Sequence, residues 1–368
     1  MKFTCIRSEL SEALQNVQRA VSTKATLPAL EGILIKAYDN KLTLTGYDLE
    51  IGITTTIDAT ITEQGEIVVG AKLFSDIVRK LPEEIASFES DERYIFYINS
   101  GNADYQIIGM SSIEYPDIPT FESTDEISLD AGVLKNMIRQ TIYAVSDNMA
   151  KPIYTGSLYE IKDNVLRIVA IDGYRMAIRK ENIEAQRNTQ FIVPGKIQME
   201  ILKLIDSDEE KVNIIVGQRH VLFTVGTYSV ISRLIEGTFL DYATTIPKDK
   251  NTEVRINTRK LISAVERMSL LTSERIQSPV KCSIGKDEIK LTCKTSVGRA
   301  SDSLQVGTVG SDVEIGFNNR YLLDALKNSE CDEVMLILNG SLTPMIVAPT
   351  DGDSFTFLVV PMRINDEN

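Results

Sequence analysis

The sequence predicts a protein of three similar α+β domains, each combining antiparallel sheet with two helices. The prediction rests on the length of 368 residues, a helical pattern that occurs three times, and strand-like segments between the helices. At about 100–200 residues per domain, this length allows two or three domains. Apolar residues make up 43% of the chain and charged residues 25%, which is ordinary for a globular protein with a core.

The first recurring element is an amphipathic helix. In each copy the core-facing positions follow the spacing i, i+3, i+4, i+7, i+11, which is typical of one helix face packed against a core. A short strand-like segment precedes each copy, at residues 3–6, 127–129 and 254–256. The repeated positions are Leu10, Ala13, Leu14, Val17 and Val21, then Leu134, Met137, Ile138, Thr141 and Val145, and finally Leu261, Ala264, Val265, Met268 and Thr272.

A second helical segment follows in each repeat and fixes the period. Its basic residues Lys72, Lys196 and Arg320 are spaced 124 residues apart. Asp48 and Asp172, in the turns between strands, are also 124 apart. A single period held by several landmarks indicates copies of a whole domain, because solenoid repeats are only about 20–50 residues long.

Segments rich in β-branched residues lie between the helices. Residues 42–57, 165–178 and 288–306 alternate in the manner of strands and are interrupted by turn residues. Each repeat is therefore predicted to be β-α-β-β-β-α-β-β. Pro- and acid-rich linkers around 120–127 and 247–253 separate the domains, which we place at 1–122, 127–246 and 253–368.

The charge distribution is uneven. The chain has a net charge of −13, which alone argues against nucleic acid binding. The six predicted helices nevertheless carry +7 together, so the rest of the chain carries −20. If the helices share one side, they form a positive surface on a negative body, which suits a protein that encircles DNA without gripping it. The alternative is that these are ordinary solvated helix faces.

Motifs for catalysis and cofactor binding are missing. The single histidine, His220, lies in a predicted strand, and the sequence has no GxSxG motif, no GxxxxGK phosphate loop and no GxGxxG fingerprint. The four cysteines form no CxxC pair, so we expect reduced, partly buried thiols and neither a metal site nor a cofactor. No apolar run approaches the roughly 18 residues of a membrane span, and the first ten residues have no secretory h-region, which predicts a cytoplasmic protein.

From Met1 to about Ile364 the chain resembles the β subunit of bacterial DNA polymerase III, the sliding clamp. The resemblance implies a DNA clamp fold and a head-to-tail homodimer, in which six domains close a ring with helices lining the hole. The segments that carry it are TLPALEGI (26–33), LTGYDLEI (44–51), YTGSLYEI (154–161), VAIDGYRMA (169–177), FIVPGK (191–196), RLIEGTFLDY (233–242) with Pro247, and VVPMRI (359–364).

The resemblance also implies a pocket between the second and third domains for short linear motifs of partner proteins. These partners are the DNA polymerase III α subunit, the clamp loader, other polymerases and repair proteins. Thr244 stands where many members have an arginine. The matching positions are Tyr154, Ile171, Gly173, Tyr174, Arg175, Met176, Leu240, Thr244, Thr245, Leu342, Pro344, Leu358, Val359, Val360, Pro361, Met362 and Arg363.

Further positions match the family's DNA and dimer contacts. Toward encircled duplex DNA, bound without sequence preference, they are Lys24, Arg79, Asn148, Lys151 and Lys196, with Gly195 where members often have arginine. At the dimer interface, Tyr105 and Ile107 of one subunit are expected to meet Leu270 and Leu271 of the other. The implied function is topological: the ring tethers the polymerase and performs no bond chemistry. Two alternatives are a transferase of α+β type and a monomeric protein-binding scaffold.

Overall fold

A computed structural model describes residues 1–120, 126–185, 187–272 and 278–364. The chain divides into two compact units. Unit 1 comprises residues 1–134 and 196–234, and unit 2 comprises residues 135–195 and 235–368. Among the described residues, no helix has the length and apolar character needed to cross a bilayer.

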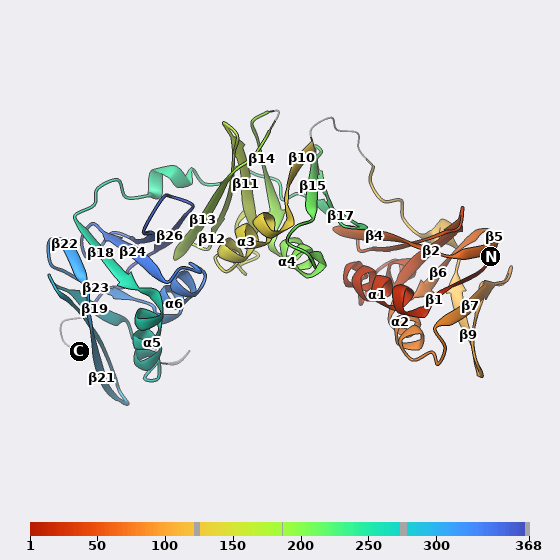
Figure 1. Ribbon diagram of the computed structural model, residues 1–368, viewed down its shortest axis with the longest axis horizontal. Coiled ribbons are helices and arrows are strands. Elements are labelled where there is room, and N and C mark those ends of the chain that lie inside the picture. The colour runs from red at the N-terminus through yellow and green to blue at the C-terminus, as the bar shows by residue number, and fades with distance from the viewer. Residues whose placement is uncertain (121–125, 186, 273–277, 365–368) are drawn as a thin grey trace. The chain divides into compact units, whose positions relative to one another are not determined.

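Unit 1 is built on one antiparallel sheet (Figure 1). Its central strands come from both segments of the unit, because β17 pairs with β4. In spatial order the strands are β10 (Glu126–Asp130), β15 (Lys211–Val216), β16 (His220–Val225), β17 (Tyr228–Arg233), β4 (Ile51–Asp58), β3 (Lys41–Tyr47), β2 (Gly32–Tyr38), β6 (Gly65–Gly70), β9 (Ala103–Met110), β8 (Ile95–Ser100), β7 (Ile85–Ser90), β1 (Lys2–Ile6) and β5 (Thr60–Glu63).

Unit 2 contains two antiparallel sheets, and β13 pairs with β26 at the centre of the larger one. The larger sheet has the order β14 (Thr189–Pro194), β11 (Gly156–Lys162), β12 (Val165–Ile171), β13 (Arg175–Asn182), β26 (Phe355–Val359), β25 (Met345–Pro349), β24 (Glu333–Leu338), β18 (Thr252–Asn257) and β22 (Gly307–Gly310). The smaller sheet has the order β21 (Gly298–Gln305), β20 (Glu288–Thr295), β19 (Val280–Ile284) and β23 (Val313–Phe317).

Each predicted helix is present. In the first helix of each repeat, the first four predicted core positions are buried, whereas the fifth ones, Val21, Val145 and Thr272, lie beyond the helix end and are half-buried. The side chains of Leu10, Leu134 and Leu261, for example, are at most 2% exposed. In unit 1, α1 and α2 pack side by side on the sheet, as α5 and α6 do in unit 2 (Figure 1). The helices are α1 (Arg7–Val17), α2 (Ala71–Arg79), α3 (Ala131–Ile142), α4 (Gly195–Leu204), α5 (Thr258–Ser269) and α6 (Asn319–Lys327), with 3-10 turns η1 (Gln18–Ala20), η2 (Pro28–Glu31), η3 (Ser112–Glu114), η4 (Pro152–Tyr154) and η5 (Tyr242–Thr245).

The predicted strand count was wrong. We expected three strands between the two helices of a repeat and two after the second helix. Instead, β2 to β6 separate α1 from α2, β11 to β14 separate α3 from α4, and three strands follow each second helix. The missed strands β6, β14 and β23 run directly into a helix with at most one intervening residue, so no loop separates strand from helix.

Successive repeats share a sheet at two junctions. In unit 1, β17 of the second repeat pairs with β4 of the first, and Ser232 lies opposite Ile51. In unit 2, β26 of the third repeat pairs with β13 of the second, and Val359 lies opposite Arg175. Ile51 and Arg175 are one 124-residue period apart, so the two junctions use the same register.

Gly46 on β3 lies against the end of α1 and provides a test of this packing. A Cβ atom at position 46 would lie 2.3 Å from the Val17 carbonyl oxygen, which is backbone and cannot rotate away. Gly46→Ala should therefore destabilise the fold by about 1–3 kcal/mol in chemical denaturation. Gly70→Ala is the control, because no atom lies within 4 Å of its added Cβ. Equal stabilities for the two variants would contradict this account.

Candidate functional site

An apolar cluster covers the face of the larger unit 2 sheet opposite its helices. Strand pairing sets Ile171 opposite Met176, and Met176 opposite Leu358. The half-buried Tyr154 packs against this cluster and meets Phe239 edge-on at 5.7 Å. We call it the outer cluster: Leu158, Val169, Ile171, Met176, Ile178, Ile192, Tyr242, Ile337, Ile346 and Leu358. Four predicted pocket residues thus come together from three chain segments.

The segment after β17 borders the outer cluster. Its Tyr242 belongs to the cluster and donates a hydrogen bond of 2.6 Å to Glu160. Of the predicted residues on this segment, Leu240 is 42% exposed, and Thr244 and Thr245 are both exposed. The hydroxyls of Thr244 and Thr245 both donate to backbone carbonyls three residues earlier, which shapes the turn η5.

Strand alternation divides the predicted pocket residues between the two faces of the sheet. Met176 and Leu358 face the outer cluster, whereas their neighbours Arg175 and Val359 face the helices. Val359 is fully buried in the helix-side core, and Arg175 is 9% exposed. These two residues therefore lie behind the outer cluster.

The turn between β12 and β13 projects into solvent. Gly173 has φ +95°, a value that favours glycine, and Tyr174 is 60% exposed. The carbonyl of Tyr174 accepts a 2.9 Å hydrogen bond from the amide of Val360, so the turn and the end of β26 are joined. Tyr174 also stacks on Tyr321 of α6, with ring centroids 5.7 Å apart. We did not predict Tyr321, because only the folded chain brings α6 beside this turn.

The remaining predicted pocket residues lie outside the outer cluster. Leu342 is 80% exposed in the loop before β25, and Pro344 follows it. Met362 forms a bridge with Gly316, donating its amide at 2.8 Å, and both Pro361 and Met362 are half-buried. Arg363 is exposed.

All five predicted DNA-facing residues are exposed. In unit 1, Lys196 pairs with Asp48 at 3.1 Å and Arg79 pairs with Asp76 at 2.6 Å. Within the described parts of the chain, Lys24 of unit 1 and Lys151 of unit 2 form no ion pair. Asn148 of unit 2 accepts a hydrogen bond from the backbone of its own loop. The full positive charge of Lys24 and Lys151 is therefore available to phosphates.

The predicted dimer contacts lie at strand edges and helix ends. In unit 1, Tyr105 is 37% exposed and Ile107 half-buried on β9, and the adjacent Ile108 is 86% exposed. In unit 2, Leu270 is 84% exposed at the end of α5, while Leu271 packs against the core. Strand pairing makes Ile107 the counterpart of Ser232 at the unit 1 junction, because Ile107 lies opposite the buried Phe96 as Ser232 lies opposite the buried Val221.

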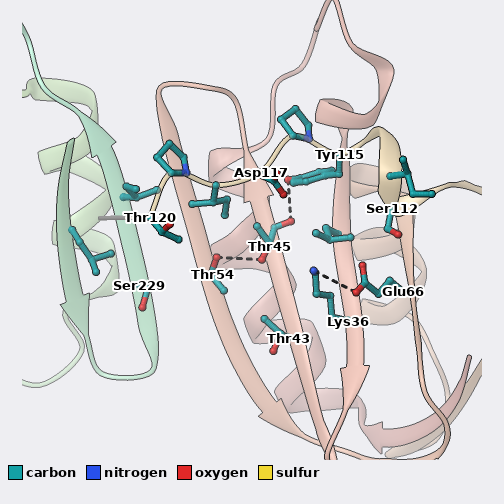
Figure 2. Close-up of a pocket in the computed structure, with 17 residues that line it drawn as sticks. Lys36, Thr43, Thr45, Thr54, Glu66, Ser112, Tyr115, Asp117, Thr120 and Ser229 are labelled. Atoms are coloured by element: carbon teal, nitrogen blue, oxygen red, sulfur yellow. Dashed lines mark hydrogen bonds and ion pairs between the residues drawn. The ribbon is translucent and has the colours of Figure 1, made fainter. Parts of the chain in front are cut away.

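A hollow of about 660 Å³ lies in unit 1 between the sheet and residues 112–120 (Figure 2). Several of its polar side chains are bonded within the hollow: Lys36 to Glu66 at 3.4 Å, Thr45 to Thr54 at 3.2 Å, and Tyr115 to the Thr45 carbonyl at 3.2 Å. A similar hollow of about 710 Å³ in unit 2 is lined by residues one period later, such as Leu158, Glu160 and Tyr242. Both hollows therefore follow from the repeated fold.

Groups that could perform catalysis are poorly placed for it. Burial and the nearby Arg233 and Arg219 lower the pKa of His220, so its imidazole is neutral near pH 7. Burial raises the pKa of the Cys282 thiol to about 12, which suppresses the nucleophilic thiolate. Among the described residues, no group of three His, Cys, Asp or Glu could hold a metal ion.

Three family models match the chain in succession. They describe the DNA polymerase III beta subunit, with its N-terminal domain at residues 1–119, its central domain at 128–241 and its C-terminal domain at 243–363. The chain belongs to the DNA polymerase III beta subunit family. It is a DNA sliding clamp, a non-catalytic processivity factor of DNA replication.

Relatives and solved clamp structures agree along the full chain. The beta sliding clamp of Bacillus subtilis is 33% identical over 376 residues, covering 99% of this chain and all of that relative. Its crystal structure aligns with a TM-score of 0.97, again over 99% and 100% of the two chains. A clamp from Pseudomonas aeruginosa bound to griselimycin has 28% identity and a TM-score of 0.93, with the same coverage. The predicted three-domain clamp fold is confirmed.

Proposed function

We propose that two copies of this chain close head to tail into a ring around duplex DNA, in the cytoplasm. The ring slides without reading sequence and tethers the DNA polymerase III α subunit, the clamp loader, other polymerases and repair proteins. Short linear motifs of these partners bind at the outer cluster of unit 2. The domain limits we propose are 1–122, 127–246 and 253–368.

The main support for a dimer is a third junction that is incomplete in the single chain. Ser232 and Val359 occupy equivalent places at the two internal junctions, and both are fully buried. The counterpart of Ser232 in the first repeat is Ile107, which lies opposite Phe96 as Ser232 lies opposite Val221, and Ile107 is only half-buried. An isoleucine partly exposed to solvent, at a position fully buried in both other copies, indicates that a second chain covers it.

The matching edge lies in the third repeat. Among the described strands, β21 pairs only with β20, and residues 103–108 of β9 pair only with β8. By the repeat, β21 corresponds to β4 and β13, while β9 corresponds to β17 and β26. Pairing β9 of one chain with β21 of another would therefore repeat the internal junctions. The two ends differ, so the contact is heterologous and closes a ring of two chains.

Negative-stain electron microscopy with a solution mass tests this proposal. A ring with a central hole and twice the 41.0 kDa subunit mass is the expected result. A compact monomer without a hole would contradict ring closure and favour the monomeric scaffold.

The unpaired lysines provide a test of the DNA contacts. Lys24→Glu should slow loading onto nicked circular DNA by about 3- to 10-fold, because each lost phosphate contact weakens electrostatic attraction. Lys196→Glu should have a smaller effect, since Asp48 already neutralises part of the Lys196 charge. Lys290→Glu, an exposed lysine on β20, is the control. Normal loading by Lys24→Glu would argue against its DNA role, and partner peptides should bind all three variants equally.

The outer cluster has the chemistry of a peptide pocket. Its buried floor of aliphatic and methionine side chains can accept leucine, phenylalanine or methionine anchors, and the exposed Tyr174, Leu240 and Leu342 form a rim. Griselimycin binds the Pseudomonas aeruginosa clamp, and we expect it to compete with partner peptides here.

A further inference from the structure

Arg175 is a buried cation beside the proposed peptide pocket. It begins β13 directly after the turn that presents Tyr174, and its side chain points to the helix side of the sheet. Only 9% of the residue is exposed. A buried guanidinium needs partners for its charge, and the identity of those partners indicates its role.

Two carboxylates from separate segments hold this guanidinium. Its Nε donates to Asp172 at 2.8 Å, and its Nη1 donates to Asp324 of α6. Burial lowers the pKa of Arg175, but Asp172 and Asp324 outweigh this effect and raise it, so the side chain stays charged. Arg175 therefore ties the β12–β13 turn to α6.

Two tyrosine rings complete the cluster. The guanidinium carbon lies 4.8 Å from the ring centre of Tyr321 and 5.4 Å from that of Tyr143, both within cation–π range. The guanidinium of Arg175 contacts the Tyr321 ring. The exposed Tyr174 ring stacks on the same Tyr321 ring at an interplanar angle of 17°. Asp172 also accepts a 2.8 Å hydrogen bond from the Tyr174 amide, so one network fixes both rings.

The corresponding junction of unit 1 lacks this arrangement of an arginine and two tyrosines. One period earlier, Arg175 is replaced by Ile51 and Tyr174 by Glu50. The carboxylate equivalent to Asp324 is Glu200, which lies 4.0 Å from Arg19 and 2.8 Å from Lys203. Both junctions pair this acid with a cation, but only the junction beside the outer cluster does so with an arginine that also orders an aromatic pair.

We propose that Arg175 is a positioning residue that holds Tyr174 and Tyr321 stacked as a rigid wall of the peptide pocket without touching the peptide. This inference rests on the proposed pocket. A wall that is ordered before binding spares the peptide the loss of side-chain freedom, which costs about 0.5–1.5 kcal/mol per immobilised side chain. Arg175 should therefore affect peptide affinity only by ordering the stacked rings of Tyr174 and Tyr321.

A double-mutant cycle tests whether Arg175 acts on peptide affinity through Tyr321. The probe is a fluorescein-labelled peptide with leucine and phenylalanine anchors, bound to the full-length dimer and followed by anisotropy. Arg175→Met should weaken binding by about 10-fold, and Arg175→Lys by about 3-fold, because lysine keeps the charge but loses the planar fork. In a Tyr321→Ala background, Arg175→Met should change affinity by less than about 2-fold.

Other outcomes decide against the proposal. Unchanged affinity in a folded Arg175→Met dimer would overturn it, as would losses that simply add to those of Tyr321→Ala. If Arg175→Met does not fold, the same cycle is run with Arg175→Lys and Asp324→Asn, and additive losses there also overturn the proposal. If Met362→Ala and Tyr321→Ala leave peptide binding intact as well, the pocket assignment has failed rather than the role of Arg175.

A spectroscopic signal reports the ring stack directly. With 3-fluorotyrosine incorporated throughout, the Tyr321 resonance is assigned by its loss in Tyr321→Phe. Arg175→Met should shift this resonance toward the unstacked position, and Arg175→Lys should restore part of the shift. A role in stability alone would lower the melting temperature without moving the resonance, and that result would overturn the proposal.

Discussion

Ile107→Asp should convert the dimer to a monomer of 41.0 kDa and raise the dimer dissociation constant by at least about 100-fold. The physical reason is that the carboxylate would be buried, without a partner, at the position where Ser232 and Val359 are buried in the internal junctions. Ile107 is only half-buried in the single chain, so the substitution should leave the fold intact. Sedimentation over a range of concentrations measures the effect.

Ile113→Asp is the matched control for the dimer. This isoleucine is also in unit 1 and is 92% exposed, but it lies in η3 and away from the edge of β9. Its mass in solution should stay at twice the subunit mass. A dimer that survives Ile107→Asp at nanomolar concentration would remove β9 from the interface. Leu270→Asp should reproduce the monomer from the other side of the contact.

Replacing both Met362 and Arg363 with alanine should weaken partner peptides by 10-fold or more, about 1.4 kcal/mol. Met362 is half-buried where the chain leaves β26, and the exposed Arg363 can pair with an acidic group of the peptide. The ring should remain intact, because neither residue belongs to β9 or β21 of the proposed contact. Titration of a labelled peptide, with griselimycin as competitor, measures the loss.

Val309→Ala is the control for the pocket. Val309 is 75% exposed on β22, at the far edge of the same sheet, and its loss should leave peptide affinity unchanged. Equal affinities for the double variant and the original chain would remove Met362 and Arg363 from the pocket. Parallel losses of affinity and of dimer mass would mean that the double variant had disturbed the fold.

Helix faces were predictable from the sequence because a helical period is a local property. The stripe from Leu10 to Val17 is buried as predicted, and so is the stripe from Leu261 to Met268. The clamp fold followed from the repeat together with the family segments. Strands such as β6 were missed because residues 65–70 are short and lead straight into α2.

Side-chain direction at the pocket could not be read from the sequence. Arg175 and Met176 are adjacent in one motif, yet alternation along β13 sends them to opposite faces of the sheet. Tyr321 reaches Tyr174 only because α6 packs beside a turn almost 150 residues earlier. The counterpart of Ile107 is Ser232, but only the strand pairing of the folded chain shows this, because the two residues are 125 positions apart and not 124.

The shared sheets at the internal junctions mean that the proposed ring has joints of different kinds. At β17–β4 and β13–β26, the paired strands belong to one chain, so their effective concentration is fixed by the linker and does not change on dilution. The β9–β21 joint has no tether and obeys mass action. A loader that opens the ring would therefore separate only one of two identical joints, and the other joint would then act as the tether that brings the open ends back together.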